Sequence, residues 1–260
     1  MGCTLSRPSP KTVRCRGKLQ RGLYFIDGGV SSQFITGLLF ATSLIDGNSE
    51  LSVTGNVESK PYIEMTKQAM ALFHAPQYRS PGSVTVEGDW SNAAFFLAAK
   101  ALGSDVAVEN LDPESAQGDR LIAELLPRLE ENITIDASDI PDLVPILAIT
   151  AGAKHGAVFT GIQRLRIKES DRVASTIAML TALGGKAEVA ESTLTVYGTG
   201  YTGGTVDACN DHRIAMAAAM AATACKEQVT ILGAEAVNKS CPRFWEEYKR
   251  LGGQYELNIR

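Results

Sequence analysis

The sequence predicts an α/β protein built from a repeated βαβαββ-like unit, and three observations support this prediction. The chain presents four times, in the same order, a polar or acidic turn, a helical pattern of small and apolar residues, a short strand and a second helical pattern that begins with charge. The first helix of each copy is apolar almost all round, which indicates burial on every side. The second helix is amphipathic, so we expect sheets and half-exposed helices to cover a bundle of inner helices.

The first two copies begin their inner helices at serine or aspartate, which are preferred helix N-caps. In the first copy, the expected helix, strand and second helix span residues 31–44, 50–54 and 60–73. In the second copy they span residues 89–102, 106–110 and 114–129. An apolar stripe makes the last of these helices amphipathic: it consists of Ile122, Leu125, Leu126 and Leu129.

The last two copies repeat the order with acidic helix starts. In the third copy the helix, strand and second helix are expected at residues 142–153, 157–162 and 168–183, and in the fourth at residues 211–224, 228–232 and 239–251. Two further strands are expected at residues 187–189 and 193–197. Because the pattern restarts at VEGD after a loop rich in proline and glycine, we place a domain boundary there. Residues 1–87 then hold one repeat and residues 88–260 hold three.

Composition narrows the class of protein. The chain has 260 residues, of which 45% are hydrophobic and 21% charged, and its net charge is −4, so neither disorder nor nucleic-acid binding is indicated. No apolar run reaches the roughly 18 residues that span a bilayer, so we expect no membrane association. The five cysteines show no CxxC spacing and the three histidines are scattered, which argues against a metal site and for a reducing, cytoplasmic compartment.

The stretch Arg164–Arg172, RLRIKESDR, gathers cations and carboxylates where a strand pattern meets a helical one. If the helix begins near Lys168, then Lys168 and Arg172 share one face beside free backbone N–H groups, a place that suits an anionic ligand. The alternative is a solvated helix start whose charges pair with one another. Glu169 lies between the two cations, where it could donate a proton beside a substrate or only form an ion pair.

Two other helix starts are rich in hydroxyl groups. Ser31, Ser32 and Gln33 follow a Gly-Gly turn, and Ser59 and Tyr62 flank the start of the next helix. The simpler interpretation is N-capping, which contributes about 1 kcal/mol. The functional interpretation is that hydroxyl, amide and backbone N–H groups hold a phosphate.

Acidic and basic residues at the remaining helix starts also allow both a structural and a functional interpretation. Asp142 precedes a nearly all-apolar helix and is either a cap or a general base. Arg213 lies in the first turn after Asp211, where the helix dipole disfavours a cation. Lys168, Arg172 and Lys239 are expected at equivalent places, so we interpret the four cations as ligands of a shared anion.

The chain contains seven motifs in this order: DGGVSSQF, ESKPYIEMT, EGDWSNAAFFLAA, PDLVPILAITA, RLRIKESDR, NDHRIAMA and NKSCPRF. This is the order found in the 5-enolpyruvylshikimate-3-phosphate (EPSP) synthase family, which the chain therefore resembles. The resemblance implies an inside-out α/β barrel of two lobes, each of three βαβαββ units, with one lobe complete here and about a third of the other present. It also implies enolpyruvyl transfer from phosphoenolpyruvate to the 5-hydroxyl of shikimate 3-phosphate, without metal or organic cofactor.

The same resemblance implies the site residues. Residues that match those holding shikimate 3-phosphate are Ser31, Ser32, Gln33, Ser59, Tyr62 and Lys168. Asp142 matches the proposed base on the 5-hydroxyl and Glu169 the proposed proton donor to the methylene carbon. Arg172, Arg213 and Lys239 match cations that bind phosphoenolpyruvate.

The chain departs from the family pattern mainly at its front. The family's KSxxxR-like loop, NAGT-like stretch and DGxxxxRxRP-like stretch do not occur, so we expect a partial enzyme that is inactive or weak alone and needs a complementing N-terminal fragment. Arg164 and Leu165 also stand where many relatives carry Asn and Trp. Alternative functions are a UDP-N-acetylglucosamine enolpyruvyl transferase-like enzyme and a non-catalytic remnant that binds shikimate 3-phosphate.

Overall fold

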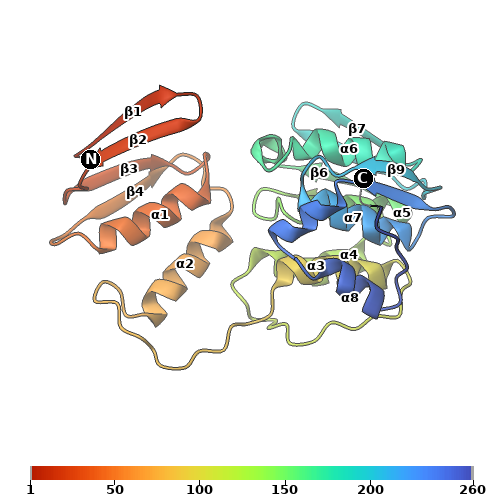
Figure 1. Cartoon of the computed structure of the whole chain (residues 1–260), viewed down its shortest axis with the longest axis horizontal. Coiled ribbons are helices and arrows are strands. Elements are labelled where there is room, and N and C mark those ends of the chain that lie inside the picture. Colours follow the sequence, from red (N-terminus) through yellow and green to blue (C-terminus); the bar gives the residue numbers. More distant parts are fainter. Residues whose placement is uncertain (1, 259–260) are drawn as a thin grey trace. The chain divides into compact units, whose positions relative to one another are not determined.

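The computed structural model describes residues 2–258 and divides into two compact units, shown in Figure 1. Unit 1 is Met1–Val86 and unit 2 is Glu87–Arg260. The sequence places the boundary between residues 87 and 88, at the VEGD restart.

Unit 1 contains two pairs of strands and two helices. The elements are β1 (Cys3–Ser9), β2 (Thr12–Gly17), β3 (Leu23–Asp27), α1 (Ser32–Ser43), β4 (Glu50–Thr54) and α2 (Lys60–Leu72). Strands β1 and β2 form an antiparallel hairpin, whereas β3 and β4 pair in parallel with α1 as the connection between them. The hairpin and β3 were not expected from the sequence, whereas β4 has its predicted bounds.

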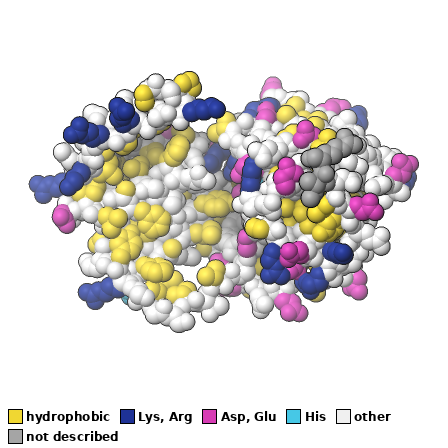
Figure 2. All heavy atoms as spheres, in the orientation of Figure 1, with side chains coloured by type: hydrophobic (Ala, Val, Ile, Leu, Met, Phe, Trp, Pro, Cys, Tyr) yellow, Lys and Arg dark blue, Asp and Glu magenta, His cyan; other side chains and the backbone are white. Residues whose placement is uncertain are grey.

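The helices of unit 1 pack on each other through a hydroxyl contact, the 2.9 Å hydrogen bond between Thr36 Oγ1 and Thr66 Oγ1. The prediction that the inner helix α1 is buried on every side is wrong, because only Ser32 and Ile35 are buried in it. Apolar side chains such as Phe34 remain exposed, and Figure 2 shows hydrophobic side chains gathered on the visible face of this unit. Within the described residues, unit 1 lacks the layers that would cover them.

Unit 2 begins with α3 and ends with α8. The elements are α3 (Trp90–Ala101), the 3₁₀ turn η1 (Gly118–Leu121), α4 (Ile122–Arg128), β5 (Ile133–Asp136), α5 (Val144–Ala153), β6 (Gly156–Thr160), η2 (Gln163–Ile167), α6 (Arg172–Ala182), β7 (Lys186–Ala190), β8 (Thr193–Tyr197), β9 (Gly204–Asp207), α7 (His212–Ala222), β10 (Val229–Leu232), η3 (Ala234–Lys239) and α8 (Phe244–Arg250). Helices α3, α5 and α7 pack against one another, as Figure 1 shows.

Helices α5 and α7 confirm the prediction of burial on every side, whereas for α3 it is wrong, because only six of the 12 residues of α3 are buried and Lys100 is exposed. All residues of α5 except the last are buried, and so are all residues of α7 except the last. Their small side chains permit close approach: a Cβ on Gly152 of α5 would collide with the Tyr201 hydroxyl, which donates a 2.8 Å hydrogen bond to Ile149 O. Apolar burial of this extent is the main stabilising contribution in a domain.

Two sheets flank these helices. The larger has the order β5-β6-β8-β7, in which β5 and β6 are parallel and β8 runs antiparallel between β6 and β7. The smaller consists of the parallel pair β9 and β10. One repeat therefore shows the full predicted βαβαββ order, from β5 to β8.

Several predicted elements are wrong in position or absent. Residues 106–110 form no strand, and the helix expected at residues 114–129 is reduced to α4 after a 3₁₀ turn. Helix α6 begins at Arg172 rather than Lys168, because Asp171 caps it by accepting a 3.1 Å hydrogen bond from Ala174 N. The last helix begins at Phe244, so Lys239 lies at the end of η3 instead of in a helical first turn.

Candidate functional site

The centre of the candidate site in unit 2 is Arg172, the first residue of α6, whose side chain is fully buried. Its Nε donates to Asp211 Oδ2 at 3.0 Å and its Nη1 donates to Asp142 Oδ1 at 2.7 Å. Its Nη2 donates to Glu169. These four residues form the Arg172 cluster, and they come from three elements far apart in the sequence.

Burial makes this pairing electrostatically important, because a charge removed from water needs a nearby partner. Burial would lower the pKa of Arg172, but Asp142 and Asp211 together raise it above its usual range. Burial would likewise raise the pKa of Asp211. The charge of Arg172 and the hydrogen bonds that Asp211 accepts from Arg172, the Arg213 amide and Ser170 outweigh this effect of burial, so the pKa of Asp211 lies below its usual range. Arg172 and Asp211 are thus held as an ionised pair at neutral pH.

Further cations surround Asp142. Lys168 Nζ lies 3.3 Å from Asp142 Oδ1, and Arg213 Nη2 lies 3.4 Å from Asp142 Oδ2. Lys239 Nζ donates to the backbone carbonyl of Asn210, the residue before Asp211. The structure therefore brings the predicted Asp142, Lys168, Glu169, Arg172 and Arg213 into one group, with Lys239 at its edge.

Arg213 is oriented by a second set of contacts that the sequence did not single out. Its Nη2 donates to Ser91 Oγ at 2.7 Å and its Nη1 to Asp142 O at 3.3 Å. Ser91 in turn hydrogen bonds to the buried Asp119, whose pKa is raised by burial although Arg213 opposes the rise. Burial and Arg213 also lower the pKa of His212 at the start of α7. Asp119 lies between Gly118 and Arg120 in the sequence, which gives no signal of its burial.

The geometry changes the interpretation of the cations at helix starts. Arg172 occupies the first turn of α6, yet three carboxylates of the protein offset the unfavourable dipole there, so an anionic ligand is not needed to explain it. Lys168 precedes the helix in an extended conformation, so the expectation that Lys168 and Arg172 share one face of a helix is wrong. Arg164 is buried in η2. Of the other predicted cations, Arg213 is buried, Lys168 is partly exposed and Lys239 is exposed.

In unit 1 the predicted residues lie at two adjacent helix starts. Ser31 caps α1 by accepting a 3.2 Å hydrogen bond from Gln33 N, as the simpler interpretation predicts. Ser59, at the start of α2, is buried and has a left-handed backbone conformation, with Tyr62 in the first turn after it. Strands β3 and β4 are parallel, and Gly28 N bonds to Thr54 O at 2.9 Å. Both helix starts therefore lie at the same end of the strand pair, where the two strands have their carboxyl ends.

Exposed backbone N–H groups at a helix start of this kind can bind a phosphate. Ser32 is buried there and Gln33 is exposed, so the amide of Gln33 is accessible to a ligand. Among residues 2–258, no cluster of three or more histidine, cysteine or acidic side chains is arranged to hold a metal ion. Of the helices within this range, none is long and apolar enough to cross a bilayer.

Solved structures with the same fold define the class. The chain superposes on an EPSP synthase from Acinetobacter baumannii with a TM-score of 0.76 and 22% identity, covering 100% of this chain and 70% of that one. It superposes on the enolpyruvyl transferase NikO from Streptomyces tendae with a TM-score of 0.66 and 17% identity, covering 97% and 69%. The fold is therefore the inside-out α/β architecture of enolpyruvyl transferases.

Sequence comparison identifies the particular family. The family model for EPSP synthase (3-phosphoshikimate 1-carboxyvinyltransferase) matches residues 12–139 and 127–248, and the chain belongs to this family. A 3-phosphoshikimate 1-carboxyvinyltransferase from Clostridium kluyveri is 38% identical over 286 residues, which cover 97% of this chain and 67% of the relative. One from Clostridium novyi is 37% identical and is covered to 65%. The chain thus spans about two thirds of the length of these relatives.

Proposed function

We propose that this chain carries the main catalytic groups for enolpyruvyl transfer from phosphoenolpyruvate to the 5-hydroxyl of shikimate 3-phosphate. The observation that supports the proposal best is the Arg172 cluster, in which two carboxylates, Asp142 and Glu169, lie on one guanidinium beside Lys168 and Arg213. The reaction needs one proton removed, one supplied and two anionic substrates neutralised, and this set of side chains can meet those needs.

In the proposed reaction, Asp142 takes the proton of the 5-hydroxyl while that oxygen bonds to C2 of phosphoenolpyruvate. Glu169 gives a proton to the methylene carbon, which becomes a methyl group in a tetrahedral intermediate. A methyl proton then returns to a carboxylate, the double bond re-forms and the C2–O bond to phosphate breaks. Lys168, Arg172 and Arg213 stabilise the charges of carboxylate and phosphate. Of the two proposed acid–base groups, Glu169 is the more exposed, with 41% of its side chain accessible.

Shikimate 3-phosphate is proposed to bind through the helix starts of unit 1. Ser31, Ser32, Gln33 and Ser59 offer hydroxyl, amide and backbone N–H donors for its phosphate, and Tyr62 lies in the first turn of α2. A second function, binding of shikimate 3-phosphate without turnover, is supported by the same donors. Titration calorimetry with each substrate alone and with both substrates together distinguishes enolpyruvyl transfer from binding without turnover.

We further propose that the chain alone turns over slowly or not at all, because it spans only about two thirds of the relatives' length. The test is a phosphate-release assay on the purified chain, with and without the unmatched third of the C. kluyveri relative. Turnover should need the added polypeptide, and Asp142→Asn should lower it by about 10²–10⁴-fold, the usual contribution of a general base. Rapid turnover by the chain alone would refute the dependence, and an active Asp142→Asn variant would refute the role of Asp142.

A further inference from the structure

The carboxylate of Asp211 is fully buried and has a hydrogen-bond donor at each oxygen besides Arg172. Its Oδ1 accepts a 2.9 Å hydrogen bond from Arg213 N, and its Oδ2 accepts a 3.0 Å hydrogen bond from Ser170 Oγ. Arg172 Nε also donates to Oδ2, at 3.0 Å. The start of α7 thus holds one oxygen of the carboxylate, and the loop before α6 holds the other.

The hydroxyl of Ser170 has a fixed direction in this contact. Asp211 is ionised beside Arg172, and an ionised carboxylate only accepts hydrogen bonds. The single proton of the Ser170 hydroxyl is therefore used on Asp211. Ser175 Oγ lies 2.9 Å from Ser170 Oγ and must then be the donor in that pair. Ser170 is thus held between a donor on α6 and an acceptor at the start of α7.

The two donors leave the contact between Asp211 and Arg172 skewed. A guanidinium and a carboxylate often form two parallel hydrogen bonds of about 2.7–2.9 Å. Here Arg172 Nε lies 3.0 Å from Asp211 Oδ2, but Arg172 Nη2 lies 3.4 Å from Asp211 Oδ1. Nη2 donates to Glu169 as well, the residue directly before Ser170. The incomplete pair of bonds to Asp211 therefore leaves Nη2 available to Glu169.

We propose that Ser170 is a positioning residue for the proton donor Glu169, an inference that rests on the proposed function. The hydroxyl of Ser170 keeps the Asp211 carboxylate turned so that its second bond to Arg172 stays long, and Arg172 Nη2 then holds Glu169. Without that hydroxyl, the carboxylate is free to turn into two parallel bonds with Arg172, and Glu169 loses its partner. Ser170 acts only through Asp211 and Arg172.

The same hydrogen bond connects two segments that carry proposed ligands. Lys168 and Glu169 directly precede Ser170, and Arg213 lies in the first turn of α7 directly after Asp211 and His212. The bond between Ser170 and Asp211 therefore joins the KESDR segment to the start of α7. A misplacement of about 1 Å can lower a rate by about 10²-fold, so this connection should affect turnover.

The test compares Ser170→Val with Ser170→Thr in the chain complemented with the unmatched third of the C. kluyveri relative. The two variants have side chains of the same shape, and only threonine keeps the hydroxyl. Ser170→Val should lower kcat at least about tenfold, part of the roughly 10²–10⁴-fold that a general acid contributes. KM for phosphoenolpyruvate should stay within about threefold, because Arg172 remains charged and buried. Ser170→Thr should keep most of the kcat of the parent, and equal kcat for the two variants would overturn the proposal.

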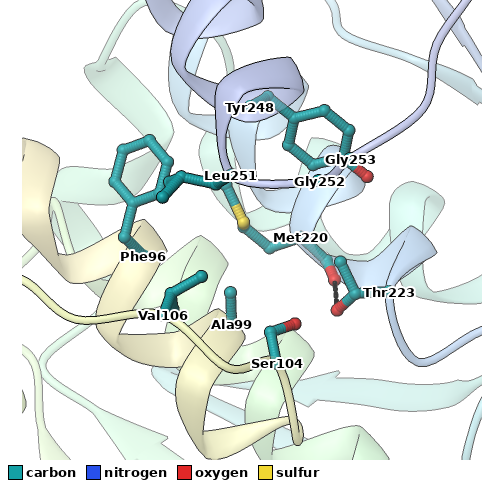
Figure 3. A pocket seen from close by; sticks show the side chains of 10 residues that line it. All are labelled: Phe96, Ala99, Ser104, Val106, Met220, Thr223, Tyr248, Leu251, Gly252 and Gly253. Carbon is teal, nitrogen blue, oxygen red and sulfur yellow. Dashed lines mark hydrogen bonds between the residues drawn. The ribbon is translucent and has the colours of Figure 1, made fainter.

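Thr223→Val is a matched control for the loss of a hydroxyl, at the opposite end of α7. Thr223 Oγ1 donates at 2.7 Å to Met220 O beside a cavity of about 170 Å³, shown in Figure 3. None of the ten residues that line this cavity belongs to the Arg172 cluster. The variant should keep kcat within about twofold, as expected for a distant and independent site. A loss as large as that of Ser170→Val would show a general effect of hydroxyl removal and refute the role of Ser170.

A crystal structure of Ser170→Val tests the geometry without turnover. Asp211 Oδ1 should move from 3.4 Å to about 2.9 Å from Arg172 Nη2, and Glu169 should no longer contact Arg172. In Ser170→Thr both contacts should match those of the parent. If Glu169 still contacts Arg172 in Ser170→Val, the proposal is wrong whether or not the chain is active. Absence of turnover in the complemented parent would instead contradict the proposed function, and the two structures would still decide whether Ser170 holds Glu169 in place.

Discussion

Removing the Arg172 guanidinium tests whether the carboxylates around it are held by this one cation. In Arg172→Ala, the fully buried Asp211 loses a 3.0 Å partner and Glu169 loses its partner. Asp142 loses its 2.7 Å contact but keeps Lys168 and Arg213 nearby. Breaking a buried pair by removing one member costs about 3–5 kcal/mol, because an uncompensated charge stays buried. We therefore expect the free energy of unfolding of unit 2 to fall by about that amount at neutral pH.

The control is Arg166→Ala, which removes an exposed cation 3.4 Å from an exposed Asp171. Exposed pairs contribute about 0–1 kcal/mol, so this variant should unfold nearly as the parent does. Both tryptophans, Trp90 and Trp245, lie in unit 2, so urea unfolding monitored by tryptophan fluorescence reports on this unit alone.

The pH dependence has a definite sign. In the parent, the pKa of Asp211 lies below its usual range, so its pairing stabilises the fold above that range and the contribution is lost as the pH falls through the folded-state pKa. In Arg172→Ala, burial without the cation should raise the pKa of Asp211 and make its ionised form a penalty that protonation relieves. The stability gap between parent and variant should narrow as the pH falls from 7.5 toward 4. Adding Asp211→Asn to the variant should restore part of the loss. A gap as small as that of Arg166→Ala would refute the reasoning, and so would a gap that does not change with pH.

Two further predictions concern single hydrogen bonds. Tyr201→Phe removes the bond to Ile149 O and should lower the stability of unit 2 by about 0.5–1.5 kcal/mol in the same urea assay, whereas Tyr197→Phe at an exposed bond should have a smaller effect. Ser31→Ala removes the cap of α1 and should destabilise that helix by about 1 kcal/mol, seen as faster hydrogen exchange at Gln33 N with unchanged tryptophan fluorescence.

Periodicity predicted the inner helices well where tertiary packing agreed with it. The apolar runs at residues 142–153 and 211–224 became α5 and α7, and the strands at residues 50–54 and 193–197 formed with their predicted bounds. A strand, however, needs a neighbour as well as a pattern. Residues 106–110 have strand-like composition but pair with none of the described strands, so their pattern alone does not make them a strand.

Helix starts were harder to predict because several residues competed for the cap. At KESDR the sequence placed the start at Lys168, but Asp171 is the better cap and moves it to Arg172. At KSCPRF, Pro242 restricts the residue before it to extended conformations, which favours a start after the proline. The partners of Arg172 could not be read from spacing, since Asp142 and Asp211 lie 30 and 39 residues away in the chain.

The pairing within the site leads to a last prediction, on protons. Four cations, Lys168, Arg172, Arg213 and Lys239, stand with three carboxylates in and around the Arg172 cluster. An incoming phosphoenolpyruvate must therefore share cations with carboxylates already bound to them. Its negative charge should favour the protonated form of Glu169, the most exposed of the three, which is also the form that the proposed proton donor requires.

Binding of phosphoenolpyruvate should thus take up a proton. Calorimetric titration of the complemented chain with shikimate 3-phosphate present, in buffers of different ionisation enthalpy, measures this uptake directly, with a turnover-deficient Asp142→Asn background to prevent reaction. Adding Glu169→Gln to that background should abolish the uptake while leaving Arg172 its buried partner Asp211. A binding enthalpy that is the same in every buffer would contradict the assignment of Glu169 as the proton donor, because a carboxylate that stays ionised beside the substrate has no proton to give.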